Sequence, residues 1–168
     1  MSAQTPLNLL LLYDTDYQDW LEKTASCLKD RNFESLDLNH LIEEIEGLGK
    51  SDRRAISSYL IRLIEHLLKL QYWQSEREHS YRVWILEINN FRLEIDLILK
   101  DSPSLNNFLK ENFIMCCEKA RRNLTKAAPE LANLLPRQPE FDLDQALNED
   151  WLPWQPGQID TQNLENSM

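Results

Sequence analysis

Residues 56–70 read ISSYLIRLIEHLLKL, and the apolar positions of this segment recur in alternating steps of four and three residues. Such steps bring side chains onto one face of an α-helix, because a helix turns once in about 3.6 residues. A helix with so broad an apolar face is expected at the centre of a helical bundle. The face consists of Ile56, Leu60, Leu63, Leu67 and Leu70 and is widened by Ile61, Ile64 and Leu68.

A second helix is predicted from Ser80 to Lys100, where the same alternating spacing returns. Between the two helices lies the polar segment SEREHS, residues 75–80, which favours a short connection and hence antiparallel packing of the pair. A symmetric fold about this segment brings residue 66 level with roughly residue 87. The inward face of the second helix comprises Trp84, Ile88, Phe91, Ile95 and Ile98.

Two helices are predicted before this pair. One begins after Asp14 and runs to about Arg31, with an acidic first turn that suits the positive end of the helix dipole. The other opens at Asp37, and two closely spaced glycines, Gly47 and Gly49, are expected to bend or stop it about three turns later.

The segment after the second long helix is predicted to be helical at first and irregular later. Ser104 is placed to cap a further helix, Pro129 to start a short turn over 129–135, and Asp142 to precede a brief helix. Several prolines beyond residue 135 favour irregular backbone there. We therefore predict an all-α fold, an antiparallel helical bundle of about four to five helices with an irregular C-terminal segment.

The length and composition predict one domain. An apolar fraction of 42% in 168 residues suffices for a single hydrophobic core. We expect an N-terminal arm over residues 1–12, a single helical bundle domain over 13–153 and a disordered tail over 154–168.

The charge and cysteine content predict an acidic protein of a reducing, cytoplasmic compartment. The net charge of −10 would repel the phosphate backbone of nucleic acids. Cys27, Cys116 and Cys117 form an odd set with two adjacent members, which does not suit disulfide pairing. The apolar run at residues 9–12 is too short for a membrane span or a secretion signal. We therefore expect neither a nucleic acid nor a membrane as partner.

Five collinear segments carry a resemblance to a known family. They read YDTDYQDWLEKTASCLKDRNFESLD (13–37), LDLNHLIEEIEGLGKSDRRAISSYLIRLIEHLLKLQY (36–72), SYRVWILEINNFRLEIDLIL (80–99), DSPSL (101–105) and LNEDWLP (147–153). Together these segments resemble the bacterial domain-of-unknown-function family numbered twenty-nine, over about residues 13 to 153. The resemblance implies an all-helical bacterial protein of a family frequent in cyanobacteria.

The resemblance implies no catalytic residues, because the family has no assigned activity. The sequence departs from the family pattern at Tyr81, where a tryptophan is expected after the serine. It also departs at Asn89 and Asn90, where a charged pair is commoner. These departures weaken any chemical role for the polar positions there.

One candidate for acid and base chemistry is the pair His66 and Glu87. His66 lies beside the apolar stripe of its helix, and the predicted register brings it to Glu87 or its neighbours. A partly buried structural pair is the simpler interpretation. The alternative is a proton-transfer or metal site in which these two groups act as acid and base.

A candidate metal site is formed by His40, Glu43, Glu44 and Glu46. On a helix, His40 is within reach of Glu43 and Glu44, and Glu43 is near Glu46, so a metal ion could find one nitrogen and two carboxylates. A di-iron bundle would need two Glu-x-x-His pairs on facing helices, and the sequence has none. A structural role is favoured, and no cofactor is predicted.

Three functional hypotheses follow. The first is a non-enzymatic protein-interaction module, such as an adaptor, a regulator or an antitoxin-like protein, with another protein as partner, which the acidic charge suggests to be basic. The second is a metal- or proton-transfer-dependent enzyme that uses His66 with Glu87 or with the glutamates at 43, 44 and 46. The third is a homo-oligomeric structural unit in which a second copy completes the apolar stripes.

Overall fold

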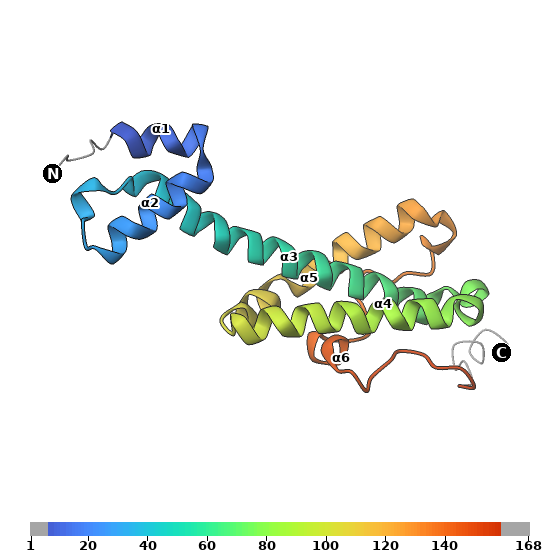
Figure 1. Ribbon diagram of the computed structural model, residues 1–168. Coiled ribbons are helices and arrows are strands. Elements are labelled where there is room, and N and C mark those ends of the chain that lie inside the picture. Colours follow the sequence, from blue (N-terminus) through green and yellow to red (C-terminus); the bar gives the residue numbers. More distant parts are fainter. Residues whose placement is uncertain (1–6, 159–168) are drawn as a thin grey trace. The chain divides into compact units, whose positions relative to one another are not determined.

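The computed structural model of the chain describes residues 7–158, and within them every regular element is a helix, so the predicted all-α fold is confirmed. Contacts divide the chain into two compact units, the first ending at Ser51 and the second beginning at Asp52. No helix within residues 7–158 is both long enough and apolar enough to cross a membrane. Figure 1 labels the α-helices of the described part of the chain. The elements in chain order are α1 (Leu7–Thr15), α2 (Tyr17–Lys29), η1 (Phe33–Ser35), α3 (Leu38–Tyr72), α4 (Gln74–Asp101), α5 (Leu105–Ala127), η2 (Pro129–Leu131) and α6 (Leu143–Leu147).

The first unit contains α1, α2, η1 and the beginning of α3. The Asp16 carboxylate caps α2 by accepting a hydrogen bond from the Asp19 backbone N–H at 3.1 Å. Trp20 is fully buried on the inward face of α2. Helix α1 occupies part of the segment that we expected to be an arm, because its run of leucines has high helix propensity and no glycine or proline interrupts it.

Helix α3 continues without a break from Leu38 to Tyr72, so the predicted bend or stop at Gly47 and Gly49 is wrong. A glycine inside a helix costs roughly 1 kcal/mol relative to alanine, which lowers helix stability without forbidding the helix. Neither glycine adopts the positive φ that commonly ends a helix. Ser51, at the end of the first unit, accordingly lies inside α3.

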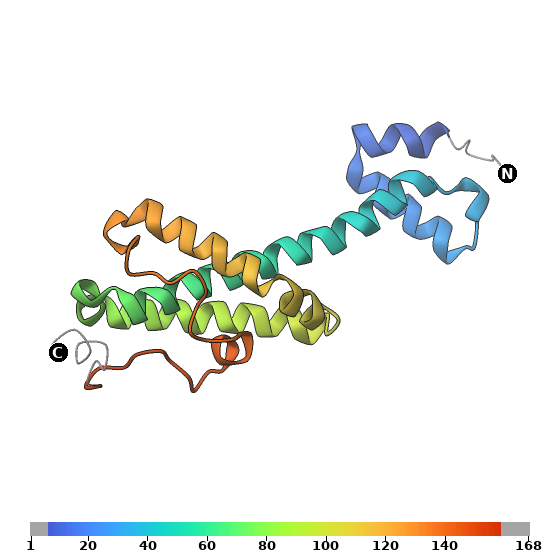
Figure 2. The ribbon, with the colours of Figure 1, turned by 180° about the vertical axis from the view of Figure 1, so that it is seen from behind.

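The second unit is built around the later part of α3 and α4, which run antiparallel and side by side (Figures 1 and 2). Only Trp73 separates the two helices. The prediction that the segment SEREHS connects them is therefore wrong, because this segment forms the first turns of α4. Its glutamates and arginine are good helix formers that also look like loop residues on polarity alone. The predicted register nevertheless holds approximately, since Lys69 lies 5.1 Å from the ring centre of Trp84.

Helix α5 and the C-terminal segment complete the core of the second unit. Pro129 begins η2, and Asp142 forms a capping box with Gln145 at the start of α6, as the sequence predicted for a turn and a brief helix. Trp154 is buried against Tyr81, with ring centres 5.8 Å apart. The predicted tail therefore starts with an anchored tryptophan, and its residues 159–168 lie outside the described part of the chain.

Candidate functional site

His66 packs against α4 close to the level that the sequence predicted. Its ring centre lies 5.5 Å from that of Phe91, and its Nδ1 donates a hydrogen bond to the Arg62 carbonyl at 2.8 Å. Burial lowers the pKa of His66 below its ordinary value, while the negative charge of Glu87 acts in the opposite direction. Within residues 7–158 no hydrogen bond joins His66 to Glu87, so a proton-transfer role for this pair stays a prediction.

The candidate metal ligands His40, Glu43, Glu44 and Glu46 all lie near the start of α3, in the first unit. His40 Nδ1 bonds to the Asp37 carboxylate at 2.5 Å, and this bond raises the pKa of His40. Glu43 and Glu46 are exposed. Among the described residues, no three histidine, cysteine, aspartate or glutamate side chains are grouped so that they could hold a metal ion.

Glu44 is held by two tyrosines of the first unit. The Tyr13 hydroxyl donates to its carboxylate at 2.6 Å, and the Tyr17 hydroxyl donates at 2.7 Å. Tyr13 also stacks on the His40 ring at 3.9 Å, and its edge meets the ring of the buried Trp20 at 5.0 Å. This arrangement ties α1 and α2 to α3, which is a structural role for a residue that we considered as a metal ligand.

The Glu44 contacts predict an acid-sensitive contribution to stability. The hydrogen bond from Tyr13, followed by that from Tyr17, lowers the pKa of Glu44 below its ordinary value of 4.5. A carboxylate whose pKa is lowered on folding stabilises the fold above the unfolded pKa, and this stabilisation is lost as the pH falls through the folded pKa. We expect Glu44→Gln to lower the free energy of unfolding at pH 7 and to differ progressively less from wild type below about pH 4.5.

Urea unfolding followed by circular dichroism at a series of pH values measures this difference. Glu34→Gln is the matched control, since Glu34 is exposed in η1, and it should follow the wild-type pH profile. A constant difference between Glu44→Gln and wild type from pH 7 to 3 would contradict the assignment, because it would show that protonation of Glu44 does not matter.

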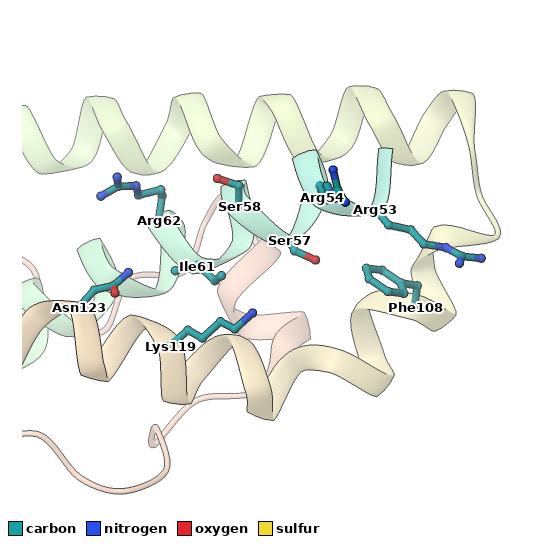
Figure 3. A pocket seen from close by; sticks show the side chains of 9 residues that line it. All are labelled: Arg53, Arg54, Ser57, Ser58, Ile61, Arg62, Phe108, Lys119 and Asn123. Carbon is teal, nitrogen blue, oxygen red and sulfur yellow. The ribbon is translucent and has the colours of Figure 1, made fainter. Parts of the chain in front are cut away.

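A basic pocket lies between α3 and α5 in the second unit (Figure 3). Its volume is about 420 Å³. Three arginines and one lysine contribute to the lining, and no carboxylate does so among the described residues. The lining residues of the basic pocket are Arg53, Arg54, Ser57, Ser58, Ile61, Arg62, Phe108, Lys119 and Asn123.

Helical spacing explains why these side chains share the pocket. On α3, Arg54, Ser58 and Arg62 follow each other at intervals of four residues and so lie along one side of the helix. On α5, Lys119 and Asn123 are also four residues apart, and Figure 3 shows the Lys119 side chain extending from α5 toward α3. The two helices therefore supply opposite walls of the basic pocket.

A buried carboxylate supports one end of the basic pocket. Glu65 is 4% exposed and accepts hydrogen bonds from Arg62 at 3.1 Å and from the Asn123 amide at 2.7 Å. These two bonds join α3 to α5 and fix the positions of two lining side chains. The charge of Arg62 is partly neutralised in this way, so Arg53, Arg54 and Lys119 are the cations with the least compensated charge.

The opposite end of the basic pocket is aromatic. The guanidinium of Arg53 lies 5.8 Å from the centre of the Phe108 ring, which is half-buried. This geometry is a cation–π contact and not a hydrogen bond, so the guanidinium N–H donors of Arg53 stay available to a ligand. Among residues 7–158, no ion pair to a carboxylate involves Arg53, Arg54 or Lys119.

The basic pocket is suited to an anion with several acceptor oxygens. Arginine presents planar donors that match phosphate and carboxylate, while lysine adds a point charge. The serine hydroxyls and the Asn123 amide supply further hydrogen bonds. Among the described residues that line the basic pocket, none is a histidine or a carboxylate that could activate a serine.

Sequence reasoning missed this pocket. The cations come from segments more than fifty residues apart, Arg53 and Arg54 on α3 and Lys119 on α5. The net charge of −10 also pointed away from any anion site. The signal that could have indicated the basic pocket is the adjacent pair Arg53 and Arg54, just before the apolar stripe of the same helix.

Comparison with known proteins identified one family. A family model described as "Domain of unknown function DUF29" matches residues 12–152, which is most of the chain. No match was found among curated proteins or among solved structures.

Proposed function

Because the chain belongs to the DUF29 family, whose description assigns no activity, we propose a function from the basic pocket itself. The chain is a non-enzymatic binding module that receives a phosphate ester between α3 and α5. The observation that supports this proposal is the cluster of Arg53, Arg54 and Lys119 around one pocket, without a lining carboxylate among the described residues. Bringing such cations together is unfavourable unless an anion compensates them.

A compact phosphate ester suits the pocket better than a nucleic-acid strand. The net charge of −10 opposes the approach of a long polyanion, whereas a short-range cluster binds one or two phosphate groups within a Debye length of about 8 to 10 Å. The phosphate could be carried by a free nucleotide or by a phosphorylated side chain of a partner protein. A partner with a basic patch, as the overall charge suggested, stays a separate prediction.

The proposal predicts a local charge effect that calorimetric titration can measure. The probes are ADP and a phosphoserine peptide, each titrated into the full chain at low salt. Lys119→Glu is expected to weaken binding of whichever probe binds by roughly tenfold to a hundredfold, because one charge-assisted hydrogen bond contributes about 1.5–3 kcal/mol. The probe that binds more tightly distinguishes the two sources of phosphate.

Lys126→Glu is the matched control for this titration. Lys126 is an exposed lysine of the same helix and does not line the basic pocket, so the variant changes the net charge equally. We expect it to alter the dissociation constant by less than about threefold. Equal losses in both variants would show a general field effect, and an absence of binding by both probes in wild-type protein would overturn the proposal.

A further inference from the structure

The outward side of α4 carries a continuous apolar stripe. Val83, Leu86, Leu93 and Leu97 are 62%, 70%, 51% and 48% exposed. With the exposed Asn90, they follow each other in steps of three and four residues, which is the spacing of the a and d positions of a heptad repeat. We call these five residues the α4 seam.

The α4 seam lies opposite the buried side of the same helix. The buried residues of α4 on the other side are Trp84, Ile88, Arg92 and Ile95, beside Arg77 near the start of the helix. At about 100° of rotation per residue, the centre of the seam is about 180° from the centre of the buried side. α4 therefore uses one side for the core of the second unit and presents a second apolar side that the described residues leave exposed.

We propose that the α4 seam is the interface of a parallel homodimer, in which two copies of the chain pair their α4 helices about a two-fold axis. This proposal does not rest on the basic pocket, which is lined by α3 and α5. Scattered exposed leucines need no explanation, but a heptad-spaced stripe along one helix is the pattern that coiled-coil pairing buries.

Asn90 specifies how the two copies align. In this heptad Val83, Asn90 and Leu97 occupy the a positions. In a parallel pair, a residue at an a position meets its own counterpart, so Asn90 meets Asn90 of the second copy in the middle of the seam. The two amides can then hydrogen-bond to each other, because each has a donor and an acceptor. An asparagine at a single a position lowers the stability of the pair but selects its register and its two-stranded state.

The charges beside the α4 seam favour the parallel orientation. In a parallel pair, Arg82 at a g position faces Glu87 at the e position of the second copy, which gives two complementary contacts. In an antiparallel pair, e positions face each other, so Glu87 would lie near Glu94 of the second copy twice. Asp96 at a g position faces the acidic Asp101 of the second copy in the parallel pair, and g positions of the second copy in the antiparallel pair. Its charge is compensated by its ion pair with Lys100 at 2.6 Å.

The short seam predicts a weak, reversible dimer. Its apolar residues extend from position 83 to position 97, which is about 21 Å of helix at about 1.5 Å per residue. Interfaces of this size fall at the low end of the range of specific protein contacts. We expect a dissociation constant on the order of micromolar.

Sedimentation equilibrium of the full chain tests the interface. Wild-type protein should dimerise, and Leu86→Asp should raise the dissociation constant by at least about a hundredfold, since it places two carboxylates in the seam. Leu134→Asp is the matched control, because Leu134 is an exposed leucine outside α4, and it should dimerise like wild type. Circular dichroism checks that each variant is folded.

A mixing experiment tests the orientation. Arg82→Glu and Glu87→Arg are each expected to weaken self-association by roughly tenfold, because each places like charges across the seam. Mixed in equal amounts, the two variants should form a heterodimer at least as tight as the wild-type pair, since both flanking contacts are again complementary. A monomeric wild type at about 100 µM, a dimer unaffected by Leu86→Asp, or a mixture that associates no better than its components would each overturn the proposal.

Discussion

Replacement of Arg92 by methionine is expected to lower the free energy of unfolding by roughly 2–4 kcal/mol. Arg92 is 3% exposed on the inward side of α4, and its guanidinium donates to three backbone carbonyls of the C-terminal segment. The acceptors are those of Ala146 at 2.9 Å, Glu149 at 3.5 Å and Trp151 at 2.9 Å. Methionine fills similar space but donates no hydrogen bond, so these carbonyls would lose their partner.

Urea unfolding measures the change in the free energy of unfolding of Arg92→Met. Two further variants separate the loss of these hydrogen bonds from the loss of a positive charge. Arg92→Lys keeps the charge, but the compact ammonium of lysine lacks the planar fork of donors that lets arginine reach three carbonyls at once. We therefore expect an intermediate loss in the free energy of unfolding. Arg122→Met, at an exposed position of α5, should change the free energy of unfolding by less than about 0.5 kcal/mol. A loss below about 1 kcal/mol for Arg92→Met would mean that the C-terminal segment is held by its apolar contacts instead.

The Arg92 contacts also illustrate what the sequence could not reveal. A helical pattern indicates that position 92 is near the inward side of α4, yet an arginine there looks like a break in the stripe. Its role depends on the end of α6 and the irregular backbone after it, more than fifty residues later, where carbonyls without a helix partner need donors. Such pairing leaves no periodic trace, and only the fold brings the partners together.

Apolar periodicity predicted the buried side of α3 in the second unit, because helical spacing gathers its apolar residues on one side where they can be buried together. All five residues of the stripe in 56–70 are fully buried. Helix ends were harder to predict, because they depend on small differences in free energy. Gly47 and Gly49 weaken α3 without ending it, and the polar residues after Trp73 favour helix as much as loop.

The candidate sites show the same contrast between local patterns, which the sequence reveals, and contacts between distant segments, which it does not. The register that placed His66 near Glu87 was approximately right, but the hydrogen bond of His66 is local, to the Arg62 carbonyl. The basic pocket required the pairing of α3 with α5, which no pattern within either helix specifies. The α4 seam, in contrast, was present in the sequence as a heptad, but the same spacing could equally have served the core.

The α3 core offers the complementary experiment, in which Leu63→Ala is expected to lower the free energy of unfolding by about 3 kcal/mol. Leu63 is fully buried within the core cluster of the second unit. Truncation removes buried methyl groups and leaves a cavity, since neighbouring α4 and α5 side chains relax only partly. Urea unfolding of this variant should show an unchanged slope and a lower midpoint.

Leu134→Ala is the control for this core variant, because the same truncation at a 56% exposed position removes little buried area. Its expected effect is below about 0.5 kcal/mol. If Leu63→Ala were equally mild, the packing of α3 against α4 and α5 would not determine the stability of the second unit. The basic pocket and the α4 seam would then lack the rigid helices on which both proposals depend, because α3 and α5 form the walls of the one and α4 carries the other.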